Sequence, residues 1–190
     1  MKTMFKTLVV IIGAAAIAAL LIPLTYSGGV GYAQVSPDPP GQKPIVGFWY
    51  VKFIAEGNTA ASTRLPSDQV PPDGAVIDWG FQQWHSDGTE VHNSGVRSAS
   101  SGDFCLGTWE IAGPRQYKLN HFATSWTPDG SSFVGIGNIH ETVTVSQDHN
   151  SLTGTFTIDQ YDKTGVLLVH LAGNIQAKRI TQNSTITDLR

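Results

Sequence analysis

The chain has 190 residues, 41% of them hydrophobic, with 12 Lys and Arg against 15 Asp and Glu and a net charge of −3. This weakly acidic composition contains no basic block. Because clustered Lys and Arg are the signature of nucleic-acid binding, it argues against a nucleic-acid partner. Cys105 is the only cysteine, which excludes an intramolecular disulfide.

The N-terminus has the pattern of a secretory signal peptide. Lys2 and Lys6 precede an uncharged apolar segment, residues 7–24. We expect cleavage after Ala33, so that residues 1–33 are a signal peptide and the mature protein is exported, to the periplasm or the extracellular space, with no membrane span. A retained membrane anchor is the alternative, because the apolar segment is comparable in length to the ~17–25 residues of a membrane span.

The mature chain would have 157 residues and a net charge of −5, which suits one domain. Residues 34–44 contain four prolines and no apolar periodicity, which predicts an extended linker. Residues 45–180 alternate between apolar and polar side chains with period two and contain no helical pattern. This pattern predicts a β-domain, followed by a polar C-terminal tail at residues 181–190.

We predict eight strands, separated by turn residues that include the hairpin signal Asp87-Gly88. Strands joined by short turns pair antiparallel with their neighbours, and eight in succession can close into an up-and-down barrel without exposed edges. A two-sheet sandwich is the alternative, but only residues 56–74 could supply the long crossing connection that it needs. The predicted strands are residues 46–55, 75–85, 89–94, 104–111, 115–126, 133–145, 152–161 and 166–180.

The two ends of this region resemble the lipocalin and calycin group. Gly47-Phe48-Trp49 opens the first strand as the Gly-X-Trp signature opens a lipocalin. Arg179, or Lys178, ends the last strand where a lipocalin carries the basic side chain that packs over this Trp. The resemblance implies an eight-stranded lipocalin-like barrel sealed by Trp49 and Arg179, with a cation–π contact of about 0.5–2 kcal/mol.

The predicted second and third strands carry polar residues of interest. A two-residue turn at Asp87-Gly88 would place His85 opposite Glu90, and residue 83 opposite His92. The face of the second strand that carries Trp79 is the more apolar one, so we expect Trp79 and His85 to point into the barrel, together with Glu90 and His92.

The predicted fifth and sixth strands add a second polar pair. Tyr117 and His121 share one face of the fifth strand, and Glu141 lies on the apolar face of the sixth. A carboxylate among inward apolar neighbours is costly unless a partner satisfies it, and His121 on the adjacent strand can be that partner.

The candidate site therefore combines aromatic and polar side chains in an interior wide enough for one small ligand. The leading hypothesis is an exported protein that binds a small apolar or amphipathic molecule. An enzyme on the same scaffold is the first alternative: an isomerase, cyclase or lyase that uses His121 and Glu141 as acid–base or metal-binding groups. A structural envelope protein with a filled core is the second. The histidine spacings match no metal motif, and the sequence identifies no cofactor. The predicted ligand-binding residues are His85, His121, Glu141, Trp79, Trp109 and Tyr117.

Overall fold

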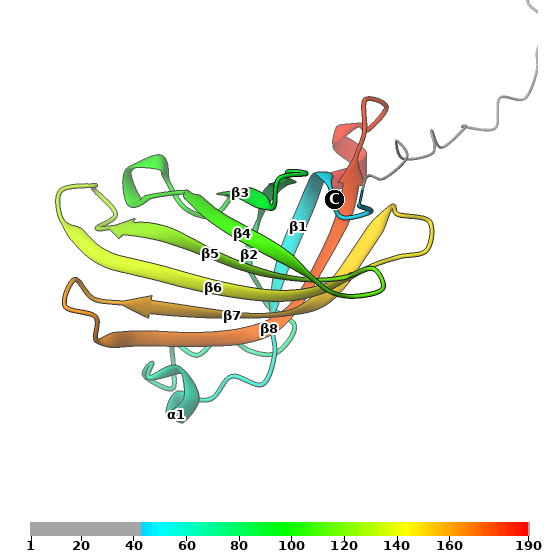
Figure 1. Ribbon diagram of the computed structural model, residues 1–190. Helices are drawn as coiled ribbons and strands as arrows, with labels where there is room; N and C mark the ends of the chain where they lie inside the picture. The colour runs from blue at the N-terminus through cyan, green and yellow to red at the C-terminus, as the bar shows by residue number, and fades with distance from the viewer. Residues whose placement is uncertain (1–42, 190) are drawn as a thin grey trace, which may run out of the picture. The chain divides into compact units, whose positions relative to one another are not determined.

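The computed structural model describes residues 43–189, so the predicted signal peptide and most of the predicted linker lie outside the described residues. Eight strands pair antiparallel in chain order, and the first also pairs with the last, which closes the barrel (Figure 1). The predicted all-β, up-and-down barrel is confirmed. Its strands are β1 (Gly47–Ala55), β2 (Val76–Trp84), β3 (Thr89–Ser94), β4 (Phe104–Gly113), β5 (Gln116–Trp126), β6 (Phe133–Val145), β7 (Ser151–Tyr161) and β8 (Leu167–Ile180).

Short helices occur only outside the barrel wall in the described part of the chain. A one-turn helix, α1 (Ala60–Thr63), lies in the long loop between β1 and β2, where the sequence predicted no helix, and Thr59 caps its N-terminus. Two 3₁₀ turns follow, η1 (Ala99–Ser101) and η2 (Ile186–Leu189). None of the helices between residues 43 and 189 is long and apolar enough to cross a membrane.

One end of the barrel is sealed by Trp49 and Arg179, and we call it the Arg179 end. The two residues are paired across β1 and β8, and the guanidinium carbon lies 4.2 Å from the centre of the fully buried Trp49 ring. Arg179 donates hydrogen bonds to the carbonyl oxygens of Val46 and Pro44, while Trp49 Nε1 donates to Ile45 O at 2.8 Å. These hydrogen bonds attach residues 44–46, which lead into β1, to the end of the barrel.

Gly47 is required by this contact. Its φ is +141°, a conformation that favours glycine, and a Cβ atom there would collide with Nη1 of Arg179. The Gly-X-Trp pattern therefore leaves space for the cation above the tryptophan.

The β2–β3 hairpin corrects one prediction. Its loop has three residues, because His85 N donates to Thr89 O at 2.9 Å and Trp84 pairs with Glu90. Asp87 Oδ1 stabilises this turn by accepting from the Thr89 backbone and hydroxyl. Compared with a two-residue loop, the register moves by one position and turns every β2 side chain to the opposite face.

Trp79 and His85 therefore do not enter the barrel as predicted. Trp79 is 38% exposed and packs on the outer surface against Tyr50, with ring centres 6.1 Å apart. Phe81 stacks on Phe48 on the same surface. The apolar face of β2 therefore lies on the outside of the barrel, where its aromatic side chains pack against those of β1. The polar face of β2, which carries Gln82, lines the interior.

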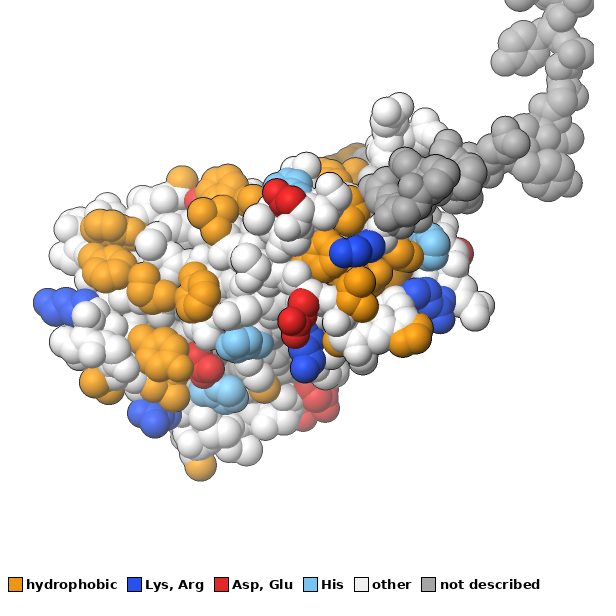
Figure 2. Space-filling view, viewed as in Figure 1, with side chains coloured by type: hydrophobic (Ala, Val, Ile, Leu, Met, Phe, Trp, Pro, Cys, Tyr) orange, Lys and Arg blue, Asp and Glu red, His pale blue; other side chains and the backbone are white. Residues whose placement is uncertain are grey.

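A second group of apolar side chains lies outside the barrel. Phe104, Leu106, Phe122 and Ile136 are between 37% and 65% exposed on the outer face of β4–β6. Figure 2 shows the hydrophobic side chains gathered over this face, toward the end away from Arg179. Apolar positions in this chain therefore do not all mark the interior.

We predict that Trp49→Ala lowers the free energy of unfolding by about 3–5 kcal/mol, because it removes a buried indole and the surface on which Arg179 rests. Urea denaturation measures the change, and Trp126→Ala is the control, because Trp126 is 40% exposed and should cost less than half as much. Equal losses in the two variants would contradict the sealing role of Trp49.

Candidate functional site

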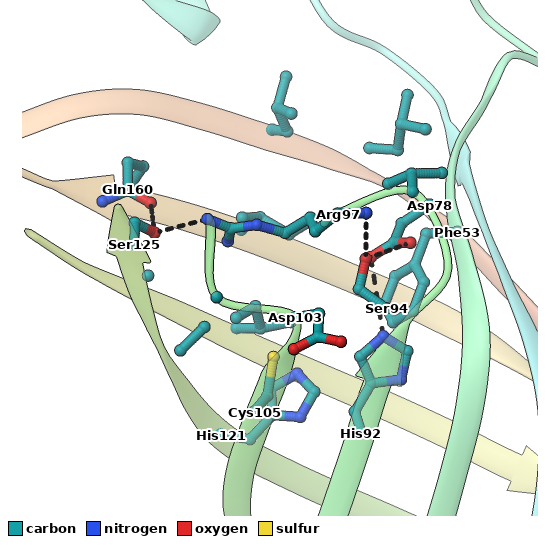
Figure 3. A pocket seen from close by; sticks show the side chains of 18 of the residues that line it. Phe53, Asp78, His92, Ser94, Arg97, Asp103, Cys105, His121, Ser125 and Gln160 are labelled. Carbon is teal, nitrogen blue, oxygen red and sulfur yellow. Dashed lines mark hydrogen bonds and ion pairs between the residues drawn. The ribbon is translucent and has the colours of Figure 1, made fainter. Parts of the chain in front are cut away.

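A cavity of about 390 Å³ occupies the other half of the barrel (Figure 3). It reaches the end where the loop of residues 95–103 lies, which we call the loop end. Its volume falls in the range of small-molecule sites. Its apolar wall consists of Phe53, Ile77, Val96, Ala123, Trp126, Val134, Ile139, Ile158 and Leu171. Its polar lining consists of Asp78, His92, Ser94, Arg97, Asp103, Cys105, His121, Ser125 and Gln160.

His121 lies at the inner limit of the cavity between two buried carboxylates. Its Nδ1 is 3.0 Å from Glu90 Oε2, and its Nε2 is 3.7 Å from Glu141 Oε1. All three side chains are at most 2% exposed. Glu90 comes from β3, His121 from β5 and Glu141 from β6, and the curvature of these consecutive strands brings the three side chains together inside the barrel.

Glu141 is oriented by a chain of hydrogen bonds. Trp84 Nε1 can only donate, and it donates to Gln82 Oε1 at 3.3 Å. The Gln82 amide nitrogen must then face Glu141, and it donates to Oε1 at 2.6 Å. The carboxylate of Glu141 is therefore held as an acceptor.

Burial shifts the ionisation of this group. Desolvation raises the pKa of Glu90 to about 8, against an opposing effect of His92. Desolvation also raises the pKa of Glu141 to about 7, although His121 and the Gln82 hydrogen bond favour its charged form. The pKa of His121 is lowered by burial, against the attraction of Glu141.

These directions assign the protons near neutral pH. A protonated Glu90 donates to Nδ1 of a neutral His121, which leaves the Nε2 proton directed toward Glu141. Glu90 Oε1 and Glu141 Oε2 are buried and make no hydrogen bond within the described part of the chain. Burying these two oxygens without hydrogen bonds lowers the stability of the fold. The cluster of Glu90, His121 and Glu141 is nevertheless positioned to transfer a proton or to form hydrogen bonds.

His92 faces the same cavity from β3. It is 2% exposed, packs edge-on against Phe53, and has no hydrogen-bond partner on either ring nitrogen among the described residues. Its Nε2 lies 3.7 Å from Asp78 Oδ2, beyond hydrogen-bond distance. Ser94 Oγ donates to the other Asp78 oxygen at 2.9 Å.

A β-bulge directs Ile77 into the cavity beside Asp78. Phe53 pairs with Asp78 but Ile54 pairs with Val76, so β2 has one extra residue at Ile77. Bulges re-aim side chains in this way near functional sites. Both Ile77 and Asp78 consequently line the cavity.

Arg97 lines the cavity near the loop end. Its Nη2 donates to Ser101 O at 2.8 Å and to Ser125 Oγ at 3.2 Å, and Ser125 donates to Gln160 Oε1. Cys105 is buried beside the cavity, and desolvation raises the pKa of its thiol to about 12. Cys105 is therefore a neutral thiol, not a nucleophilic thiolate.

The structure brings His121 and Glu141 together but separates the other candidates from them. His85 lies in the hairpin turn, where its Nδ1 is 3.0 Å from Thr89 Oγ1. Trp109 is buried toward the Arg179 end, where it packs against Tyr117 and Trp84. His85, Trp79, Trp109 and Tyr117 do not line the cavity.

Several residues of the site were not among the candidates. Glu90 and His92 could have been found from the sequence, because they alternate on one face of β3 and that face was predicted to point inward. The sequence contains no such indication for Gln82 and Asp78, since the orientation of their shared face depends on the three-residue turn. Arg97 lies in a loop that no periodicity describes.

Within residues 43–189, no group of three or more His, Cys, Asp and Glu side chains is arranged to hold a metal ion. Compared with known proteins, the chain matches no family model, no curated protein and no solved structure. Function must therefore be argued from the cavity itself.

We predict that the free energy of unfolding falls as the pH rises from 6.5 to 8. In this window the unfolded chain has lost the Glu90 and Glu141 protons, whereas the folded protein keeps the Glu90 proton up to about pH 8 and releases the Glu141 proton around pH 7. A fully retained proton contributes a slope of about −1.4 kcal/mol per pH unit, so the fall is steepest at the start of the window and becomes shallower as each glutamate ionises. His121 contributes a smaller, opposite slope near pH 6.5, because burial lowers its pKa in the folded state while the unfolded imidazole is still about half protonated there, and this contribution fades as the pH rises toward 8.

Denaturation of the Glu90→Gln variant between pH 6.5 and 8 measures how much of the pH dependence of the unfolding free energy comes from Glu90. The substitution should remove that part. Asp129→Asn is the control, because the pKa of this exposed carboxyl is lowered to about 2 by hydrogen bonds from Thr127 and Ser131. An unchanged slope in Glu90→Gln would show that Glu90 ionises normally in the folded protein.

Proposed function

We propose that this chain is an exported, lipocalin-like protein that binds one small apolar or amphipathic molecule in its barrel cavity. The observation that carries the proposal is the combination of an apolar wall with His92, whose two buried nitrogens lack hydrogen-bond partners among the described residues. Buried polar groups are normally hydrogen-bonded, so His92 indicates that a ligand or ordered water completes its environment.

The lipocalin-like part of the proposal rests on Gly47, Trp49 and Arg179 in a closed eight-stranded barrel. The export part rests on the pattern of residues 1–33. N-terminal sequencing of the protein expressed with its leader tests the latter, and Gln34 is the expected first residue.

The catalytic alternative rests on the position of His121 between Glu90 and Glu141. A buried carboxylate with a raised pKa beside an imidazole is typical of general acid–base sites. Of the two groups assigned to catalysis from the sequence, however, only His121 lines the cavity. Glu141 could act only through His121, and this favours binding as the primary function.

The cavity also distinguishes binding from the third hypothesis, a structural protein with a filled core. Such a protein needs neither an interior space nor polar side chains converging on it. Here a space of about 390 Å³ is lined by two histidines and two aspartates.

We predict that N-phenyl-1-naphthylamine, an uncharged fluorescent probe, binds the protein with increased emission, and that Ala123→Trp weakens binding at least tenfold. Ala123 lines the cavity, so a Trp there would occupy the ligand's space. Fluorescence titration measures both affinities.

Thr124→Trp is the matched control, because the next residue of β5 points outward and is exposed. It should bind the probe like the wild type. Equal binding by Ala123→Trp would place the probe outside the barrel and refute the cavity as the binding site.

A further inference from the structure

The charged side chains that line the cavity are separated in space. Asp78, Asp103 and His92 gather on one side, whereas the Arg97 guanidinium extends to Ser125 on the other (Figure 3). Each aspartate has one oxygen in hydrogen bonds, Asp78 with Ser94 and Asp103 with Asn93. The second oxygen of each makes no hydrogen bond with any residue that the structure describes.

Arg97 does not neutralise these carboxylates. Among residues 43–189, no Asp or Glu oxygen lies within ion-pair distance of its guanidinium. The aspartate side of the cavity therefore keeps its negative charge and has more hydrogen-bond acceptors than donors.

His92 provides independent support for a ligand on that side. It is 2% exposed and makes no hydrogen bond within residues 43–189, while Asp78 lies 3.7 Å from its Nε2. A neutral imidazole offers one acceptor nitrogen, and this acceptor is buried without a donor among the described residues.

We propose that the ligand is an amphipathic primary amine whose ammonium group binds Asp78, Asp103 and His92. This inference rests on the cavity-binding function proposed above. An ammonium group has three N–H donors, which match two carboxylate oxygens and one imidazole nitrogen. Charge-assisted hydrogen bonds offset the desolvation of the cation, and the apolar wall accommodates the rest of the molecule.

The charge distribution disfavours the corresponding anion. A carboxylate on the same side would face the carboxylates of two aspartates. A neutral alcohol would gain the apolar contacts but not the charge-assisted bonds. The three classes should bind in the order amine, alcohol, carboxylate.

The experiment compares n-octylamine, 1-octanol and octanoate by isothermal titration calorimetry at pH 7. We expect octylamine to bind at least tenfold more tightly than octanol, and octanoate more weakly than octanol. Asp78→Asn and Asp103→Asn should each weaken octylamine at least fivefold with little effect on octanol.

Glu110→Gln is the control for net charge, because Glu110 is exposed on the outer face of β4. It should not change octylamine binding. Thermal unfolding of each variant verifies that it is folded, and Asp103→Asn provides the test if Asp78→Asn is not.

The outcomes separate the two proposals. Octanol binding as tight as octylamine, or octanoate binding more tightly than octylamine, would overturn the amine assignment and leave the cavity-binding function intact. The same conclusion follows if octylamine binding is unchanged in both aspartate variants. Failure of all three probes to bind would overturn both proposals.

Discussion

Pairing between β1 and β8 is the constraint on which the rest of the structure depends. It closes the sheet and places Arg179 over the ring of Trp49. Arg179 also donates a hydrogen bond to Val46 O, which attaches the segment before β1 to the barrel. The side chains of Trp49 and Arg179 together fill the Arg179 end. Because one end is filled, the free interior space lies at the other end, and every residue of the proposed site faces that space or the layer next to it.

Closure also explains why charged residues can occupy the interior. Glu90, His121 and Glu141 come from β3, β5 and β6 and face one another inside the barrel. Glu90 lies within hydrogen-bond distance of His121, and Gln82 of β2 donates to Glu141 across the closed interior. Glu90 Oε1 and Glu141 Oε2 are buried without a hydrogen bond among the described residues, which lowers the stability of the fold. The raised pKa values of both glutamates reflect the same desolvation. A barrel that served only as a scaffold would gain stability by replacing this layer with apolar side chains. The layer is therefore best explained by function.

Much of the fold could be predicted because turn residues and period-two alternation are local signals. They predicted all eight strands, and they placed His121 and Glu141 on inward faces of β5 and β6. The glycine before Trp49 also carried a signal with a physical cause, since a side chain there would collide with Arg179.

The prediction was wrong where orientation depends on one residue in a turn and on packing outside the barrel. Asp87-Gly88 belongs to a three-residue loop, so His85 and Trp79 point away from the cavity, and Gln82 points inward. The assumption that the more apolar face is the inner face also failed for β2, because Trp79 packs on Tyr50 outside. Asp78 lies on the same face of β2 as Gln82 and was missed for the same reason, and the loop that carries Arg97 has no periodic signal.

The central claim is that a small molecule occupies the cavity beside His92. Long-range ¹H–¹⁵N spectra resolve the ring nitrogens of the six histidines, and titration with N-phenyl-1-naphthylamine tests the claim directly. We expect the His92 and His121 signals to shift as the probe saturates the protein, while the signal of the exposed His140 on the outer face of β6 does not change. Shifts at His140 with none at His92 would contradict it.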